Sequence, residues 1–200
     1  MRECISIKTD YSLLKSLIQI DALLSYATNN KIETLGIIDD NLSGTIEFLK
    51  NCYKNNIKPV IGYEITYKDK IIILYAKHYE GLKKLFKLNT YLLNNSLDIV
   101  ELTKYINDLI ILLPYESIEL FTELNEICKD LFIGYQSEKE KVSALLLTNK
   151  VIYFRVALAL TKEDTNYLKL IEAIDKGLTL SEITTDYSED YLKESDSSLL

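Results

Sequence analysis

Short apolar runs alternate with stretches of helical periodicity along the first half of the chain. Apolar residues at positions 20, 23, 24 and 27 follow the i, i+3, i+4, i+7 spacing of an amphipathic helix. Lys68 and Asp69 separate two β-branched-rich runs and predict a hairpin. We expect further helices around residues 46–53 and 82–89, and strands at Cys4 to Lys8, Thr34 to Ile38, Pro59 to Tyr67 and Lys70 to Ala76.

The same alternation continues in the second half. Thr161 and Asp164 have the spacing of a capping box, which predicts a helix that runs to about Ile174. From Asp186 onward acidic residues and Ser dominate, and we expect a frayed or unfinished end. The other expected elements are helices around residues 120–127 and at Val142 to Leu147, and strands at Leu109 to Leu113, Leu131 to Tyr135 and Val151 to Phe154.

This order of elements predicts the fold class. Strands that alternate with helices over short connections form a mostly parallel sheet covered by helices, so the chain is α/β. About six or seven such units suit a distorted (β/α)7-type barrel better than a half-length open sheet. In barrels of this kind the chemistry lies at the carboxyl ends of the strands, so candidate functional residues are sought there.

Composition narrows the class of function. The 200 residues suffice for one domain, or for two small ones, with a real hydrophobic core. A net charge of −7 argues against a nucleic-acid clamp, because phosphate binding needs clustered Lys and Arg. The N-terminus lacks the apolar segment of a signal peptide, and the longest apolar runs fall far short of the ~18 residues that span a bilayer. We therefore expect no membrane association.

The three cysteines, Cys4, Cys52 and Cys128, are widely spaced and form no CxxC pair. That spacing fits neither a disulfide framework nor a zinc ribbon. We expect each to be a small buried residue in a reducing compartment, the cytoplasm.

Carboxylates follow the early predicted strands. Asp39 and Asp40 come after the second strand, Glu64 lies in the third, and Lys8 and Thr9 end the first. Such carboxylates could hold a divalent cation through oxygen ligands, although an Asp-Asp pair is more commonly a helix-entry loop. No histidine accompanies them. The single histidine of the chain follows the hairpin among lysines and is expected at the surface: His78.

Several stretches resemble a known family in order and spacing. IKTDYSLL, IIDDNLSGTIEFLKNCYKNNIKPVIGYEI and ILYAKHYEGLKKLFKLNTYL are similar to the PHP (polymerase and histidinol phosphatase) domain at the N-terminus of bacterial DNA polymerase III alpha subunits. LTKEDTNYLKLIEAIDKGLTLSE resembles the last helix of that domain, and DYSEDYLKES its exit. The resemblance implies a PHP-like domain over residues 1–185, with residues 186–200 beginning the linker to the next polymerase domain of a longer chain.

The departures from the family pattern concern the metal-binding positions. Asp39 and Glu64 match two acidic ligand positions, whereas the family's imidazoles are missing. The resemblance therefore implies a degenerate metal site with no catalytic residue and no metal or other cofactor, in which Lys8 could pair with Asp39 or Glu64 in place of the cation. The remaining ligand positions carry Cys4, Ser6, Lys8, Gly134, Val156 and Leu158.

Three hypotheses for function follow from the resemblance. The first is a catalytically inactive scaffold and subunit-docking module within a DNA-directed DNA polymerase, a nucleotidyltransferase of DNA replication. Its partners would be the remainder of the polymerase chain and a proofreading or another replisome subunit. DNA would be bound by the parent polymerase, with Lys83, Lys84 and Lys87 forming either a solvated helix face or a contact with another part of the polymerase. The alternatives are a metal-dependent phosphoesterase or 3′–5′ exonuclease with a remodelled site, and a free-standing regulatory protein with a borrowed fold.

Overall fold

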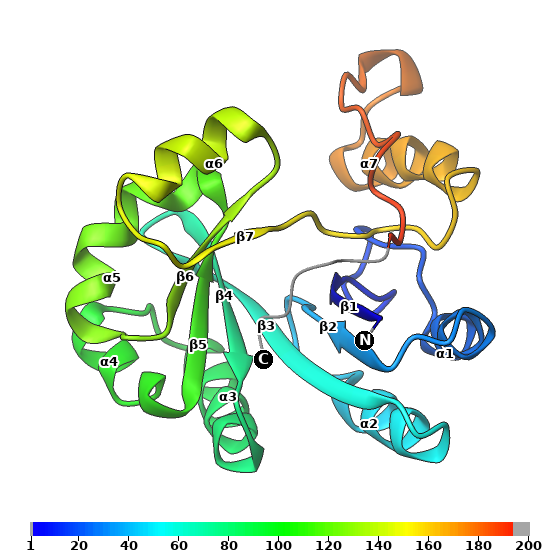
Figure 1. Cartoon of the computed structure of the whole chain (residues 1–200). Coiled ribbons are helices and arrows are strands. Elements are labelled where there is room, and N and C mark those ends of the chain that lie inside the picture. The colour runs from blue at the N-terminus through cyan, green and yellow to red at the C-terminus, as the bar shows by residue number, and fades with distance from the viewer. Residues whose placement is uncertain (1, 194–200) are drawn as a thin grey trace. The chain divides into compact units, whose positions relative to one another are not determined.

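The computed structural model describes residues 2–193 of the chain, in two compact units (Figure 1). The first unit holds described residues 2–60 and 156–193, and the second holds residues 61–155. Both units combine strands and helices, and the strands within each follow one another in chain order. The predicted α/β class is confirmed.

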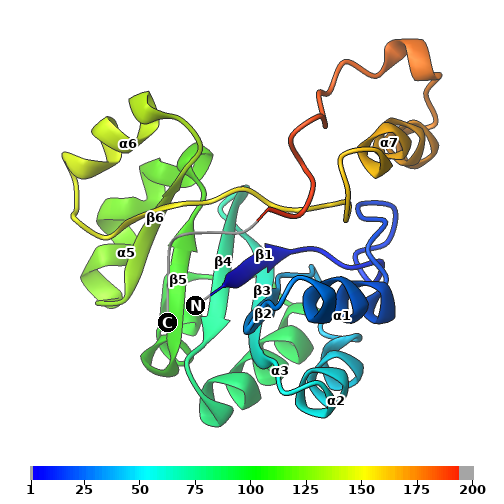
Figure 2. The same cartoon turned by 45° about the vertical axis from the view of Figure 1, so that its right-hand side comes forward.

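A parallel strand pair with two neighbouring helices begins the first unit (Figures 1 and 2). The apolar spacing of the first helix buries the predicted positions, Ile20, Leu23, Leu24 and Ala27. This part of the first unit contains β1 (Glu3–Ile7), α1 (Ile20–Asn29), β2 (Thr34–Ile37), α2 (Thr45–Lys54) and the start of β3 (Lys58–Tyr67), with β1 parallel to β2.

Gly36 allows the two parallel strands to approach closely. A Cβ atom at this position would lie 2.8 Å from the Cα atom of Ile5 on β1. Since side-chain carbons essentially never come that close to backbone, only glycine fits β2 here.

The end of the described chain returns to the first unit. Ala157 pairs with Ile7. The turn at Thr161 and Asp164 has the two bonds of the predicted capping box, with the amide of Asp164 donating to Thr161 Oγ1 at 3.3 Å and the amide of Thr161 donating to Asp164 Oδ2 at 3.1 Å. A 3₁₀ turn (Asp164–Tyr167) then leads into α7 (Leu168–Lys176), which ends at Gly177 in the left-handed conformation.

The segment after α7 is ordered as far as the structure describes it. Tyr191 forms a bridge to Ala159, and the amides of Leu158 and Ala159 donate to the carbonyl of Asp190 at 2.8 and 3.1 Å. The expectation of a frayed end from Asp186 is therefore wrong as far as Lys193. Residues 194–200 lie outside the described residues, and the boundary at residue 185 stays a prediction.

The second unit contains a mixed sheet. The β3–β4 hairpin reverses the chain, so β4 runs antiparallel both to β3 and to β5, whereas β5, β6 and β7 are parallel. All five residues of β5 are buried, as the uninterrupted apolar run predicts. The strands are the rest of β3, β4 (Lys70–Ala76), β5 (Leu109–Leu113), β6 (Leu131–Tyr135) and β7 (Val151–Tyr153).

Four helices accompany this sheet (Figures 1 and 2): α3 (Tyr79–Leu92), α4 (Ile99–Thr103), α5 (Phe121–Ile127) and α6 (Glu138–Leu145). The helix α6 starts four residues before the predicted Val142, because Ser137 and Glu140 form a capping box there. The short helix α4 was not expected. Its N-terminal amide at Glu101 is capped by Asp98 at 2.7 Å.

The β3–β4 turn places two residues other than glycine in the left-handed region. Lys68 has φ 48° and Asp69 has φ 60°. Two-residue hairpins need such angles, which strain residues that carry a Cβ. On α5, Glu123 accepts from Lys68 Nζ at 2.6 Å and from the hydroxyl of Tyr67 at 2.6 Å, which fixes the turn against the helix.

Candidate functional site

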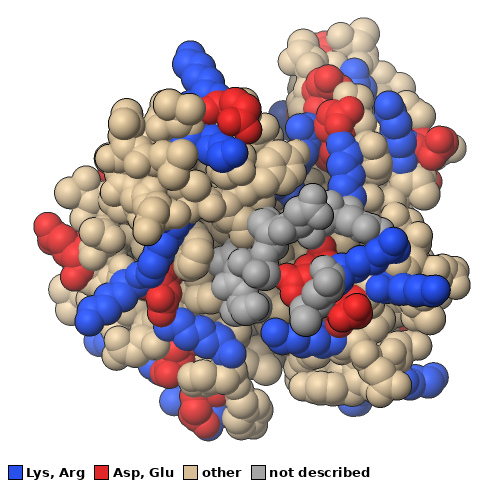
Figure 3. Space-filling view, viewed as in Figure 1, with Lys and Arg blue, Asp and Glu red and all other residues tan. Residues whose placement is uncertain are grey.

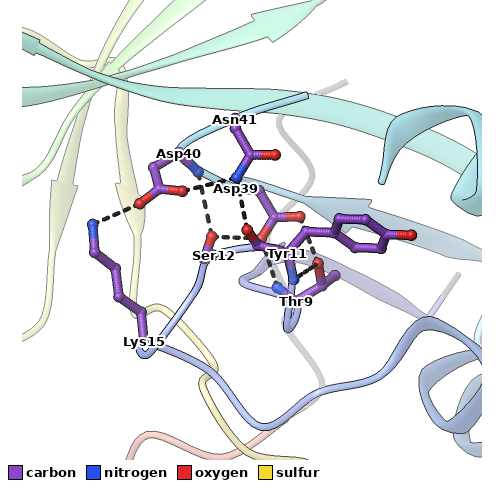
Figure 4. Close-up of polar contacts among 7 residues, drawn as sticks. All are labelled: Thr9, Tyr11, Ser12, Lys15, Asp39, Asp40 and Asn41. Atoms are coloured by element: carbon purple, nitrogen blue, oxygen red, sulfur yellow. Dashed lines mark hydrogen bonds and ion pairs between the residues drawn. The ribbon is translucent and has the colours of Figure 1, made fainter. Parts of the chain in front are cut away.

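A buried carboxylate stands where β2 ends. The side chain of Asp39 is held by three donors, all from the loop that follows β1 (Figure 4). The backbone amide of Thr9 and the hydroxyl of Ser12 each donate to Oδ1 at 2.7 Å, and the hydroxyl of Thr9 donates to Oδ2 at 2.7 Å. Asp39 is 2% exposed, and Thr9 and Ser12 are fully buried, so the cluster is closed to water.

The parallel pairing of β1 and β2 creates this arrangement. Parallel strands end at the same edge of a sheet, and the amide of Ile38 donates to the carbonyl of Ile7 at 2.8 Å. The next residues of the two strands therefore face each other across that edge. The loop after β1 closes on itself, because the amide of Asp10 donates to the carbonyl of Ile18 at 2.9 Å and Ser16 Oγ donates to the carbonyl of Lys8 at 2.6 Å.

A second, more exposed carboxylate forms the rim of the cluster. Lys15 Nζ lies 2.7 Å from Asp40 Oδ2, and Asn41 Nδ2 donates to Asp40 Oδ1 at 3.2 Å (Figure 4). The same amide group of Asn41 donates to the carbonyl of Tyr11 at 2.7 Å. These contacts join the loop after β1 to the loop after β2 at the surface, as the hydrogen bonds from Thr9 and Ser12 to Asp39 do in the interior.

The two neighbouring aspartates have opposite pKa shifts. Burial raises the pKa of Asp39, and the hydrogen bonds from Thr9 and Ser12 offset that effect only in part. Burial also raises the pKa of Asp40, but the hydrogen bond and charge of Lys15, together with Asn41 and the charge of Lys8, outweigh it and lower the pKa. A cation thus favours the ionised form of the rim carboxylate, whereas the neutral donors to the inner one do not fully compensate for its burial.

The other ligand positions that the resemblance assigns to the first unit lie on or just after β1 and on the chain that follows β7. Cys4 and Lys8 are buried, and Ser6 is half-buried on β1. Val156 and Leu158 are half-buried, and the carbonyl of Leu158 accepts from Ser16 Oγ and from the amide of Leu17, both at 3.0 Å. The pairing of Lys8 with Asp39 or Glu64 stays a prediction.

Two predicted positions belong to the second unit. Glu64 is half-buried on β3, opposite Ile73 of β4. Gly134 is buried on β6, where an added Cβ would lie 2.7 Å from the Cβ atom of Phe154. Phe154 therefore fills the space that an acidic side chain at position 134 would need.

The remaining candidates lie where the sequence predicts them. His78 is exposed before α3 and lies 3.3 Å from Asp108. Cys4, Cys52 and Cys128 are all buried. Burial raises the pKa of Cys52 to about 12, which keeps this thiol protonated and unreactive.

A comparison with protein families finds the PHP domain over residues 5–153. The chain belongs to the PHP domain family. The match confirms the resemblance and, with the α/β strands and helices of both units, the expected distorted-barrel fold class of PHP domains.

Curated relatives extend this result. The chain is 27% identical over 192 residues to the DNA polymerase III subunit alpha of Streptococcus pyogenes serotype M3 and 26% identical over 220 residues to that of Halalkalibacterium halodurans, covering 94% and 93% of the chain. With the subunit of Ureaplasma parvum it shares 35% identity over 92 residues, 46% of the chain. The matches cover 18%, 20% and 10% of these relatives, so the chain spans at most about a fifth of their length.

The Asp39 cluster does not fit the metal that PHP domains are expected to bind. A divalent cation needs several carboxylate or imidazole ligands with free lone pairs. In this PHP domain Asp39 already accepts three hydrogen bonds, two on Oδ1 and one on Oδ2, which use three of the roughly four lone-pair sites of a carboxylate. Within residues 2–193, no group of three or more His, Cys, Asp and Glu side chains is placed to hold a metal ion. The arrangement of these side chains therefore supports no catalytic step through a metal.

Sequence reasoning found Asp39 but missed most of the residues that hold it. The sequence predicts Thr9 only as the end of a strand, and it assigns no role to Ser12, Lys15 or Asn41. The available signal was the run of short polar residues in TDYS directly after a strand, since such side chains favour local hydrogen bonds in loops.

In the described part of this PHP domain, no helix is long and apolar enough to cross a membrane.

Proposed function

We propose that this chain is the N-terminal PHP domain of a bacterial DNA polymerase III alpha subunit and that it serves as a catalytically inactive scaffold. The observation that carries the assignment is the similarity to alpha subunits over 94% of the chain, together with the PHP match. The alignment with the Streptococcus pyogenes subunit covers far more of the chain than residues 5–153, so it includes the elements that follow the PHP match.

The hydrogen bonds of Asp39 support the absence of hydrolytic chemistry. Metal-dependent hydrolysis requires a cation that polarises the substrate or activates water. Here hydroxyl and amide donors occupy the carboxylate that would carry such a cation. The positions Cys4, Ser6, Val156 and Leu158 offer no imidazole or carboxylate, and Phe154 takes the space beside Gly134.

The proposed partners follow from the parent polymerase. They are the remainder of its chain and a proofreading or another replisome subunit, in the cytoplasm. DNA would be bound mainly elsewhere in the polymerase. On the face of the described residues in Figure 3, basic and acidic side chains are interspersed, and the net charge of the whole chain is −7. On α3, Lys83 pairs with Glu80 at 2.6 Å and Lys84 pairs with Asp108.

The test is a hydrolysis assay on the full-length protein that contains this chain. We expect no Mn²⁺- or Zn²⁺-dependent release from a 3′-labelled oligonucleotide or a phosphomonoester beyond that of a matched Glu64→Ala variant. Turnover that disappears in Glu64→Ala and in Asp39→Asn would instead establish the alternative, a metal-dependent exonuclease or phosphoesterase. Primer extension by the same protein tests the polymerase assignment separately.

A further inference from the structure

The helix α7 exposes a row of apolar side chains. Leu170 and Ile174 lie one turn apart on α7, and Tyr167, the N-cap residue of α7, stands three positions before Leu170, so the three follow the spacing of one helical face. They are 60%, 47% and 61% exposed. Just beyond the helix, Leu178 and Leu180 are exposed as well. We call the residues Tyr167, Leu170 and Ile174 the α7 stripe.

One charged side chain of the same helix is covered by the chain that follows it. The side chain of Glu172 is only 10% exposed. Its carboxylate accepts from the hydroxyls of Thr185 and Tyr187 at 2.9 and 3.0 Å and pairs with Lys176 at 2.5 Å. A surface helix normally buries its apolar face and exposes its charges. In α7 one apolar side follows this rule, because Leu168 and Ala173 are buried, whereas the α7 stripe is left exposed.

The position of α7 relative to the two comparisons points to its partner. The PHP match ends at residue 153, before α7 begins. An alignment that covers 94% of the 200 residues omits only about 12 of them, so the Streptococcus pyogenes alpha subunit must be aligned with α7. The α7 segment is therefore matched by a polymerase subunit although it lies outside the PHP match, and about four-fifths of that subunit lies outside this chain.

We propose that the α7 stripe docks onto the remainder of the polymerase chain. This inference rests on the proposed function and assigns to it a specific contact surface. A contiguous apolar face gains free energy when it is removed from water, and aromatic and aliphatic side chains such as Tyr167 and Ile174 are suitable anchors. The contact would hold the PHP domain in place through α7, on residues separate from the Asp39 cluster.

The test uses thiol labelling of the full-length protein. Ile174→Cys and Ile46→Cys are matched variants, because both isoleucines are exposed on helices of the first unit, at 61% and 52%. Labelling of each position by a maleimide is followed by mass spectrometry of its peptide. If α7 is docked, the thiol at position 174 should react at least about tenfold more slowly than the thiol at position 46, because covered sites react only through opening.

The outcomes separate the proposal from its competitors. Slow labelling at position 174 that does not change with protein concentration supports docking within one chain. Equal labelling at the two positions overturns it, and so does protection that grows with protein concentration, which would indicate a second copy on the stripe. A protein that fails to extend primers overturns the proposed function, whatever the labelling shows.

Discussion

Thr9 holds both oxygens of the Asp39 carboxylate, with its amide on Oδ1 and its hydroxyl on Oδ2, each at 2.7 Å. The carboxylate is buried, so these bonds replace the water it would otherwise have. One threonine in the loop after β1 thus fixes an aspartate just after β2. The strand edge where chemistry is expected in this fold is instead closed by hydrogen bonds within the chain.

The hydroxyl of Thr9 should contribute measurably to stability. Thr9→Val keeps the shape of the side chain but removes one donor to a buried charged group, which should cost about 1.5–3 kcal/mol of unfolding free energy. Urea denaturation of the two proteins measures the difference. Thr90→Val is the control, because Thr90 is exposed on α3 and its hydroxyl donates to the carbonyl of Phe86 within its own helix. A loss no greater than that of the control would contradict the prediction.

The same substitution should cost less when the charge is absent. In an Asp39→Asn background, Thr9→Val removes a bond to a neutral group, which is worth about 1 kcal/mol. The double-mutant cycle therefore isolates the charge-dependent part of the contact. Equal costs in the two backgrounds would mean that the Thr9 hydroxyl does not stabilise the ionised carboxylate.

An acidic residue at position 134 should not be accommodated. Gly134→Asp would force its Cβ against Phe154 and bury a carboxylate, so we expect a loss above about 3 kcal/mol. Gly177→Asp is the matched control: no atom lies within 4 Å of the added Cβ, and aspartate tolerates the left-handed conformation at a cost of about 1 kcal/mol. Thermal unfolding compares the two variants. Similar unfolding midpoints for the two variants would show that Phe154 can move to accommodate the aspartate.

Acid should weaken the second unit through Asp130. Its hydrogen bond with Lys77, at 2.6 Å, lowers the pKa of Asp130, and Lys150 adds to that effect. A carboxyl whose pKa is lower in the folded state stabilises the fold above its unfolded pKa, and this stability is lost as the pH falls through the folded value. Between about pH 6 and pH 3, Asp130→Asn should therefore lose less unfolding free energy than the unchanged protein. A parallel decline of both proteins in urea titrations would exclude this role.

The lysines of α3 should not bind DNA appreciably. Two of them, Lys83 and Lys84, are already paired with acidic groups, and the net charge is −7. Changing Lys83, Lys84 and Lys87 together to Ala in the full-length protein should leave primer–template affinity within about twofold, because few counterions are released by such lysines. Fluorescence anisotropy at low and moderate salt provides the measurement. A large loss that shrinks with added salt would place a DNA contact on this helix.

The strands could be predicted well because their signals are local. The uninterrupted run from Leu109 to Leu113 and the hairpin at Lys68 and Asp69 give strands and a turn without knowledge of distant contacts. Helix boundaries follow less directly from the local sequence than strands do. In α6 only Ala144 is buried, so its apolar pattern is weak and the start at Ser137 depends on capping. The five-residue helix α4 is too short to show a helical period.

The candidate site could be predicted only in part. Asp39 is visible in the sequence because it follows a buried strand. Its partners Thr9 and Ser12 are about thirty residues away, and only the register of β1 with β2 brings them together. The crowding of Gly134 by Phe154 likewise depends on the packing of β6 with the chain after β7. Such contacts are set by tertiary structure, which a single sequence does not specify residue by residue.

The strained turn between β3 and β4 offers a route to engineering. Since Asp69 adopts φ 60° with a Cβ atom, Asp69→Gly should relieve strain while leaving the Lys68–Glu123 pair intact. A protein stabilised in this way would have a wider margin before unfolding, and such a margin determines how many harmful substitutions a chain tolerates. The Asp69→Gly protein would then serve as the background in which the residues of the Asp39 cluster are replaced one at a time.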